Sequence, residues 1–272
     1  MQELIAYNAA EAENLLGAVK SFLMSKGIML RKKYDAGEKS QAETLDDSPW
    51  VKPFIIQTET PAFYLELNSP DDIERLNSEL ESRLNELQGN LKTFLQNNSD
   101  LDEALANKIN MIASSNLTRA KQAIKFGLKK NLNADAQKCN SVAELREAAG
   151  RRYEDFLKQN FMERIMVPLY EGLRQTPKEP AYLWVLNEAN NFLADLGVVT
   201  VNISVGELYD ENSPYVPSEE SQSEKFATTD AQEKDTVREI LRYAYAFQED
   251  NGARIIMDGE VIVMVYRPEG AQ

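Results

Sequence analysis

The side chains that carry out most acid–base, nucleophilic and metal chemistry are scarce in this chain. The sequence contains no histidine and a single cysteine, Cys139. Ser-His-Asp and Cys-His catalysis, histidine metal sites and ordinary zinc fingers are therefore excluded. No P-loop, G-x-G-x-x-G motif, EF-hand pattern or convergent carboxylate pair at helical spacing stands out. We therefore expect a protein that is not an enzyme and that uses no cofactor or metal.

Two other groups of side chains have types that could bind a ligand. Cys139 follows Lys138, but a reactive thiol needs more positive charge at a helix start, so an ordinary cysteine is expected. A basic run places several lysines on one helix face, where they could form an anion-binding ridge. Its members are Lys121, Lys125, Lys129 and Lys130. Because no aromatic residues interleave with them, a solvated face is the preferred interpretation.

Length and charge limit the possible partners. With 272 residues, the chain is either one elongated unit or two small domains. The net charge of -14 opposes binding to nucleic acid, since phosphates would repel this surface. No basic n-region opens the sequence, and no stretch approaches the roughly 18 apolar residues of a membrane span. A lone cysteine fits a reducing compartment, so we expect a cytoplasmic protein that contacts no membrane.

The first half of the chain has helical patterns. Residues 8–26 predict an amphipathic helix that ends at Gly27, residues 34–50 predict a loop, and 51–67 predict short extended pieces or an edge strand. Ser69-Pro70-Asp71-Asp72 predicts a helix start with a serine cap, and the helix should end near Asn97-Asn98. Asp100 is expected to cap a further helix that reaches Leu128. Together they predict an antiparallel hairpin, or a hairpin that pairs with a second copy.

A second helical region follows from Ser141. Ser141 and Glu144 match a capping box, and the apolar face continues to about Leu173, with Pro168 expected to kink or divide the helix. After the prolines at 177 and 180, another apolar stripe ends at Gly197, which is expected at the C′ position.

The end of the chain has a different composition. Residues 207–235 contain nine acidic residues against two lysines, with prolines, serines and threonines, which is typical of a loop or mobile segment. Residues 236–247 and 260–266 are β-rich. Asn251-Gly252 and Asp258-Gly259 are tight-turn signals between them. The sequence therefore predicts a small antiparallel β-domain at the end.

The stretch from about Ala148 to Tyr266 resembles GrpE, the nucleotide exchange factor of DnaK-type chaperones. The resemblance rests on the segments RRYEDFLKQNFMERIMVPLYEGL, FLADLGVVTVNISVGELYDEN, DTVREILRYAYAF and ARIIMDGEVIVMV, which follow the family's order. The chain departs from the family at Ala244, where the family has glycine, and at Met257-Asp258, where the family has Arg-Pro. The acidic segment is also about eight residues longer, and Tyr215-Val216 stands where the family usually has a His-Glu-Ala-Val element.

The resemblance implies an α+β fold that is mostly helical, with long helices, coiled-coil character and a dimeric four-helix bundle, followed by the β-domain. It implies four regions: 1–140, helical and without assigned function; 141–205, the long helix and dimerisation hairpin; 206–235, the acidic loop; and 236–272, the β-domain. The implied dimer contacts are Phe161, Ile165, Leu169, Leu186, Phe192 and Leu193.

The resemblance also implies a function as a stress-response co-chaperone. One β-domain of a homodimer would bind the nucleotide-binding domain of a DnaK-type chaperone and promote ADP release. The partner-facing residues carried over by position are Arg254 and Val263, with Asp258 and Glu260 nearby. Arg254 could equally be a solvated strand arginine, and Val263 a core valine. The alternative is a GrpE-derived dimeric adaptor without exchange activity, which the departures and the long N-terminal region favour.

Overall fold

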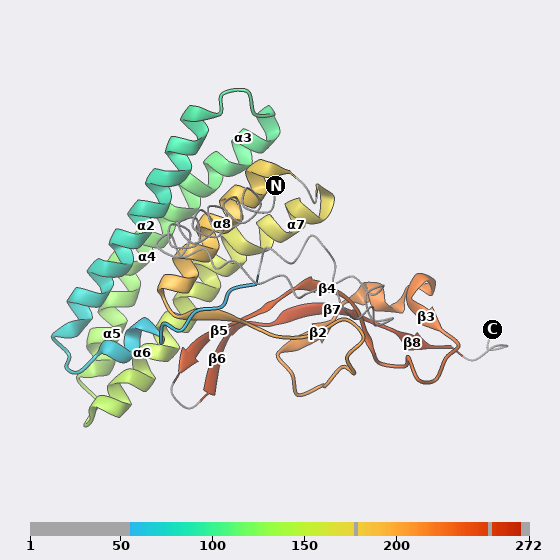
Figure 1. Cartoon of the computed structure of the whole chain (residues 1–272). Coiled ribbons are helices and arrows are strands. Elements are labelled where there is room, and N and C mark those ends of the chain that lie inside the picture. The colour runs from blue at the N-terminus through green and yellow to red at the C-terminus, as the bar shows by residue number, and fades with distance from the viewer. Residues whose placement is uncertain (1–54, 177–178, 250–251, 268–272) are drawn as a thin grey trace, which may run out of the picture. The chain divides into compact units, whose positions relative to one another are not determined.

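The computed structural model of the chain describes residues 55–176, 179–249 and 252–267. The chain divides into two compact units, Met1–Thr44 and Leu45–Gln272, and every described residue belongs to the second. The predicted helix over 8–26 and loop over 34–50 lie outside the described residues. The second unit has an α+β fold in which the long helices precede the strands, as Figure 1 shows. The predicted boundaries at 140, 205 and 235 all fall inside this unit.

Helix α2 spans Asp72–Asn97 and ends where the sequence predicts. Its start differs from the predicted serine cap, because the backbone N–H and hydroxyl of Ser69 both donate to the Asp72 carboxylate. The backbone N–H groups of Asn68 and Ser69 hold the pKa of that carboxyl below its usual range. This is half of a capping box, in which the acidic residue of the first turn supplies the acceptor.

The next helical stretch runs without a break from residue 103 to residue 136. It consists of α3 Glu103–Asn110, a π-helical turn Met111–Asn116, α4 Leu117–Ala123, a second π-helical turn Ile124–Leu128 and α5 Lys129–Ala136. Asp102 caps it by accepting from the N–H groups of Ala104 and Leu105, so the predicted cap at Asp100 is wrong by two residues. The stretch is antiparallel to α2, which confirms the predicted hairpin.

The π-helical turns follow from the spacing of the apolar residues. Buried residues recur every four positions along this stretch: Ile112, Asn116, Ala120, Ile124, Leu128, Leu132 and Ala136. An α-helix has 3.6 residues per turn, so a repeat of four would drift steadily around its surface. Turns with wider π-helical bonding absorb the extra residues and keep the stripe on one face.

The third helical stretch consists of α6 Val142–Leu157, a π-helical segment Lys158–Met166 and α7 Val167–Gln175. Ser141 caps it as predicted, by accepting from the Glu144 N–H. Of the two predicted effects of Pro168, division of the helix is wrong, since the chain stays helical through it, with a π-helical segment just before it. In an α-helix the Arg164 carbonyl would accept from residue 168, and proline has no N–H. The side-chain amide of Asn116 donates to that carbonyl instead, at 2.8 Å.

Helix α8, Pro180–Asp195, completes a bundle of four helical stretches within one chain. It lies against α2, where Asn90 donates to Glu188 at 2.7 Å and the rings of Phe94 and Trp184 stack at 4.2 Å. Gly197 follows with a φ of 72°, as expected for a residue that ends a helix in the left-handed region. Among the described helices, none combines the length and the apolar character needed to cross a bilayer.

The strands form two three-stranded sheets and one two-stranded sheet. The first sheet has the order β1 (Val198–Val201), β5 (Ala244–Glu249), β6 (Gly252–Met257), and the second has the order β2 (Tyr215–Pro217), β7 (Gly259–Val263), β4 (Val237–Arg242). Strand β3 (Ala227–Thr228) pairs with β8 (Val265–Tyr266). Pairs β1·β5, β5·β6 and β4·β7 are antiparallel, whereas β2·β7 and β3·β8 are parallel.

Between β4 and β7 the chain crosses twice between the two three-stranded sheets. The chain leaves the second sheet after β4 and enters the first as β5, with Tyr243 at the break; it returns after β6, with Asp258 at the break. Asp258-Gly259 is therefore a crossing between sheets and does not form the predicted tight turn. Gly259 is needed for another reason: a Cβ there would lie 2.1 Å from the ring of Tyr215.

The first sheet is joined to the helices by backbone bonds. The Ala62 N–H donates to the Gln248 carbonyl at 2.8 Å, and the Phe63 N–H donates to the Leu196 carbonyl at 3.2 Å. Phe63 begins a short 3-10 helix, Phe63–Glu66. A Cβ on Gly197 would lie 2.2 Å from the Pro61 carbonyl oxygen, so this glycine both ends α8 and admits the neighbouring backbone.

Candidate functional site

Arg254 lies on β6 and extends toward α6. Its Nε donates to Glu249 Oε1 at 2.7 Å and to the Tyr64 hydroxyl at 3.3 Å. Its Nη2 donates to Glu147 Oε2 at 2.5 Å, and its Nη1 lies 3.8 Å from Glu154 Oε2. Only 16% of this side chain is exposed. The residue that was expected to face a partner therefore fastens the β-domain to α6.

Several acidic groups share this one guanidinium. Burial raises the pKa of Glu154, and Arg254 opposes that effect. Burial and the bond to Glu249 raise the pKa of the Tyr64 hydroxyl, which stays protonated. A Cβ at Gly150 of α6 would lie 2.8 Å from Arg254 Nε, so this glycine leaves room for the guanidinium. The cluster therefore connects β6 to α6, and these contacts occupy the guanidinium nitrogens of Arg254.

Asp258 and Glu260 lie at the sheet crossing. Arg242 at the end of β4 lies 3.6 Å from Glu260 Oε2, and its guanidinium is within 3.4 Å of the Asp258 carbonyl oxygen. The Asp258 residue is exposed and Glu260 is half-buried. Val263, by contrast, is 93% buried, and its N–H donates to the hydroxyl of Ser221 at 3.1 Å. Of the four predicted partner-facing residues, Asp258 and Glu260 come together and the other two lie elsewhere.

A group of tyrosines holds the crossing from the helical side. The hydroxyls of Tyr170 on α7 and Tyr245 on β5 lie 2.9 Å apart, and the Tyr243 N–H donates to Tyr170 at 3.3 Å. Burial raises the pKa of both the Tyr170 and the Tyr245 hydroxyl, which keeps them neutral. These hydroxyls satisfy the buried backbone at the break in the sheet and are closed off from any substrate.

The six residues predicted to form the dimer interface are all buried within one chain. They are Phe161, Ile165, Leu169, Leu186, Phe192 and Leu193. Phe161 and Phe192 stack against each other, with ring centroids 4.6 Å apart. The helices α2 and 103–136 pack with this region, so the apolar surface that a second copy was expected to cover is covered within the chain.

The basic run of the sequence faces α2. Lys121 donates to Asn85 at 2.7 Å and to Gln88 at 2.6 Å. Lys125 lies 3.0 Å from Glu81, and Lys129 pairs with Glu74. These pairs connect two antiparallel helices at successive turns, so the run is a set of helix–helix links and leaves no anion-binding ridge along these three lysines.

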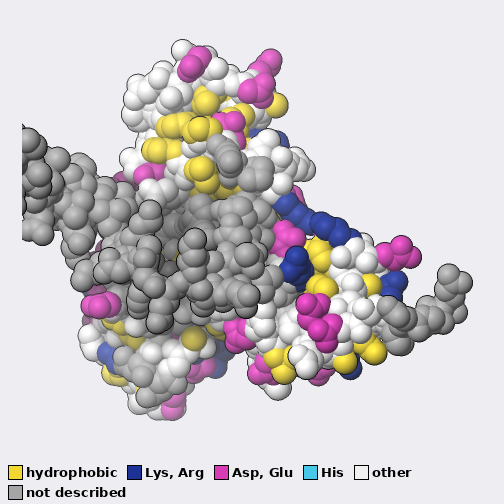
Figure 2. Space-filling view, turned by 45° about the vertical axis from the view of Figure 1, so that its right-hand side comes forward, with side chains coloured by type: hydrophobic (Ala, Val, Ile, Leu, Met, Phe, Trp, Pro, Cys, Tyr) yellow, Lys and Arg dark blue, Asp and Glu magenta, His cyan; other side chains and the backbone are white. Residues whose placement is uncertain are grey.

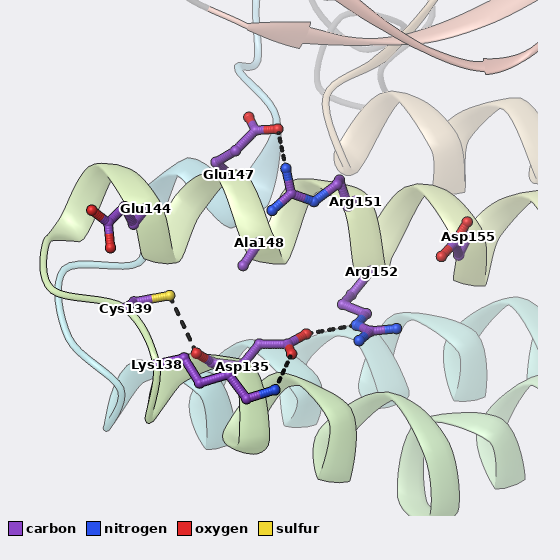
Figure 3. Close-up of a pocket in the computed structure, with 9 residues that line it drawn as sticks. All are labelled: Asp135, Lys138, Cys139, Glu144, Glu147, Ala148, Arg151, Arg152 and Asp155. Carbon is purple, nitrogen blue, oxygen red and sulfur yellow. Dashed lines mark hydrogen bonds and ion pairs between the residues drawn. The ribbon is translucent and has the colours of Figure 1, made fainter.

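A cleft of about 500 Å³ lies between the end of α5 and the first turns of α6 (Figure 3). Its lining residues are Asp135, Lys138, Cys139, Glu144, Glu147, Ala148, Arg151, Arg152 and Asp155. Arg152 donates to Asp135 at 2.7 Å and lowers the pKa of that carboxyl, while Arg151 donates to Glu147 at 2.9 Å. The Cys139 thiol contacts the Asp135 carbonyl oxygen at 3.3 Å. The charges of this cleft are largely satisfied by one another.

Across 55–176, 179–249 and 252–267, no group of three or more His, Cys, Asp or Glu side chains is arranged to hold a metal ion. On the face shown in Figure 2, acidic and basic side chains lie beside one another with hydrophobic groups between them.

Sequence reasoning missed the residues of the acidic segment that contact the β-domain. Tyr215, Ser221 and Phe226 are all buried there, and Glu220 binds Arg174 of α7. One signal was present: Tyr215 and Phe226 are large aromatic residues in a stretch that is otherwise polar. A polar loop does not need buried aromatics, so they indicate anchors.

Comparisons of the chain with protein-family models, with curated proteins and with solved structures found no match.

Proposed function

We propose that this chain is a GrpE-like co-chaperone that binds the nucleotide-binding domain of a DnaK-type chaperone through its β-domain and promotes ADP release. The observation that best supports the proposal is the order of the helices and strands along the chain. Helices α6 to α8 lead through Gly197 directly into the strands, in the order that the resemblance implies. The lack of a metal cluster among the described residues is compatible with a protein that acts by binding alone.

Binding alone can accelerate nucleotide release. A protein that binds the open form of a partner more tightly than the closed form shifts the partner toward the open form. The exposed Asp258 and the neighbouring Arg242 and Glu260 form a charged corner at the junction of the two sheets. We infer that this corner contacts the chaperone, because the adjacent backbone at Tyr243 is held by the Tyr170 hydroxyl, which also contacts Tyr245. A rigid surface loses little conformational entropy on binding.

A second candidate is an adaptor without exchange activity. One observation favours it: Arg254, which was expected to face a partner, is engaged with α6. The six proposed dimer residues are covered within one chain, which disfavours a dimer through them for both candidates. An adaptor of this type would bind its partner through the same β-domain corner and leave the partner's nucleotide affinity unchanged.

The two candidates differ in one measurable rate. We expect the purified chain to accelerate release of a fluorescent ADP analogue from a DnaK-type chaperone in stopped-flow experiments. Asp258→Ala should reduce the acceleration about fivefold or more, as expected for loss of an interface contact of about 1 kcal/mol. Glu86→Ala, an exposed carboxylate on α2, is the matched control and should have no effect.

Absence of acceleration at every concentration, together with measurable binding to the chaperone, would establish the adaptor instead. Absence of both binding and acceleration would exclude both candidates. Light scattering on the same samples gives the number of copies in the complex.

A further inference from the structure

Strands β7 and β8 have two edges that are covered in different ways. On one side, β7 pairs with the long antiparallel strand β4. On the other side, only residues 214–228 cover the edge, and we call this segment the strap. The strap runs parallel to β7 and β8 in two short pieces, β2 and β3. Between them lie two short 3-10 helices, Glu219–Gln222 and Glu224–Phe226.

The strap is held by a few deep anchors. Its buried residues are Tyr215, Ser218, Ser221, Phe226 and Thr228. The positions between these anchors are mostly exposed, including Val216 at 48%. A strand of a sheet core would alternate regularly between buried and exposed positions. Isolated anchors with exposed spacers are instead the pattern of an extended peptide that lies in a groove.

The first anchor fits a slot made by a glycine. The Tyr215 ring occupies the space where Gly259 has no side chain, and its hydroxyl donates to the Val201 carbonyl at 2.5 Å. The backbone beside it continues the ladder, with the Gly259 N–H donating to the Pro214 carbonyl at 2.8 Å. The groove therefore selects an aromatic residue with a hydroxyl at this position.

The second anchor is a serine. Ser221 has no exposed surface, and its hydroxyl accepts from the Val263 N–H at 3.1 Å. A side chain thus replaces the backbone carbonyl that a regular strand would supply. Further along, Phe226 is buried and β3 follows directly. The groove therefore takes a tyrosine, a serine six positions later and a phenylalanine five positions after that.

The outer links of the strap are exposed and weak. Arg174 of α7 binds both carboxylate oxygens of Glu220 at 2.5 Å, but the two side chains are 42% and 49% exposed. Ion pairs this exposed contribute little because water screens them. Arg267 adds a bond to the Gln222 carbonyl at 2.8 Å. These outer links therefore add little to the buried anchors that hold the strap.

We propose that the β7–β8 edge is a peptide-binding groove that the strap occupies in cis, and that it accepts an acidic segment of a partner protein in trans. The partner segment carries the tyrosine, serine and phenylalanine spacing of the strap, with a carboxylate that reaches Arg174. The proposal goes beyond the co-chaperone function and does not depend on it. The strap limits the affinity for the partner because it must be displaced first.

The test uses a fluorescent peptide with the sequence of residues 213–229 as the probe for the groove. In the full chain, Ser221→Ala weakens the strap in cis while the peptide keeps its own serine. We expect Ser221→Ala to bind the peptide about fivefold more tightly than the unaltered chain, from the loss of one buried hydrogen bond. Gln222→Ala is the matched control, because the Gln222 side chain is exposed and its loss should leave the affinity unchanged.

A locked variant gives the opposite result. Val216 and Glu260 are register partners in the β2·β7 pair, so Val216→Cys with Glu260→Cys, in a Cys139→Ser background, places two thiols within disulfide reach. We expect the oxidised form to lose peptide binding and the reduced form of the same protein to regain it. Equal binding by the two forms places the peptide elsewhere and overturns the proposal.

Two further outcomes are decisive. Amide exchange shows whether the strap has loosened in Ser221→Ala: the Gly259 and Val263 amides should then exchange faster, and the Gln248 amide should not. If the strap has loosened and the variant still does not bind the peptide, the proposal is overturned. If the Ser221→Ala protein has twice the monomer mass without peptide, two copies exchange their straps. This outcome also overturns the proposal that the groove binds a segment of a partner protein. Faster exchange with tighter peptide binding supports the proposal.

Discussion

The helical bundle and the β-domain cover their apolar surface in different ways. In the bundle, each apolar stripe is matched by another helix of the same chain, and polar links such as Lys125 to Glu81 join the outer faces. In the β-domain, the strands change sheet at Tyr243 and Asp258, and one edge is covered only by the strap. The apolar stripes of the bundle are thus matched within one chain, whereas the β-domain depends on a short segment at one edge and exposes a charged corner at Asp258.

The difference also shows in how each region admits close contacts. In the bundle, π-helical turns realign side chains that repeat every four residues, and Gly172 leaves space for the ring of Tyr182. In the β-domain and its junction with the helices, Gly259 and Gly197 leave space for Tyr215 and for the Pro61 backbone. Truncation of large bundle side chains should therefore act through lost packing, and substitution of these glycines through steric conflict.

The largest expected effect concerns the bundle. Phe161→Ala should lower the free energy of unfolding by about 3–5 kcal/mol, since it removes a buried ring that stacks on Phe192. Urea denaturation measures this loss. Phe126→Ala is the matched control: its ring is 79% exposed, and the change should stay within about 0.5 kcal/mol. A urea midpoint that rises with protein concentration would instead indicate that these residues are shared between two copies.

The next largest effect concerns the junction between the two regions. Gly197→Ala should lower the free energy of unfolding by about 3 kcal/mol, because φ is 72° and the new Cβ would collide with the Pro61 carbonyl. Gly89→Ala in α2 meets no atom within 4 Å and should stabilise the chain by up to about 1 kcal/mol. Thermal unfolding of both variants checks the contrast, and equal effects would contradict it.

A smaller effect tests how the bundle tolerates Pro168. Asn116→Leu should cost about 2 kcal/mol, because the Arg164 carbonyl loses its donor while the volume stays similar. In a Pro168→Ala background the backbone supplies a new N–H, so the same substitution should cost clearly less. A double-mutant cycle in urea measures the coupling. Identical costs in both backgrounds would show that the proline and the asparagine act independently.

The smallest effect compares carboxyls of opposite behaviour. Arg152 lowers the pKa of Asp135, so this carboxylate stabilises the bundle above its usual pKa, and the contribution disappears as pH falls through the lowered value. Burial raises the pKa of Glu154 at the junction, so its protonated form is favoured, and stability is lost as pH rises through the raised value.

We therefore expect Asp135→Asn to destabilise the chain at neutral pH by less than about 1 kcal/mol and to have no effect in strong acid. Glu154→Gln should become relatively more stable than the unaltered chain as pH rises. Chemical denaturation at a series of pH values measures both trends. The same sign for both variants at neutral pH would contradict the assignment of the two environments.

Much of the helical region could be predicted from the sequence because its signals are local. The apolar spacing predicted α2, the hairpin that follows, the helix from Ser141 and the helix that ends at Gly197. The error of two residues at Asp102 arose because Asp100 and Asp102 are both good caps, and only packing chooses between them. The four-residue repeat over 112–136 was also visible in the sequence, but the π-helical turns that keep it on one face were not predicted.

The β-domain was predicted less well, because its contacts join residues far apart in the chain. The β-rich runs were recognised, but the breaks at Tyr243 and Asp258 depend on hydroxyls from α7 and on the pairing of β7. The strap was interpreted as a loop from its charge. Its burial depends on three anchors whose slots are formed by other strands.

By itself, the sequence determined the exclusion of histidine chemistry, the α+β class and the positions of the main helices. These properties depend on composition and on the periodicity of neighbouring residues. Only the tertiary structure decided what each of these surfaces contacts. The predicted dimer residues pack inside the chain, Arg254 connects β6 to α6, and the acidic segment covers a strand edge. Burial depends on contacts between segments that are distant in the sequence. Local patterns therefore identify which residues are apolar, and the fold decides which segments bury them.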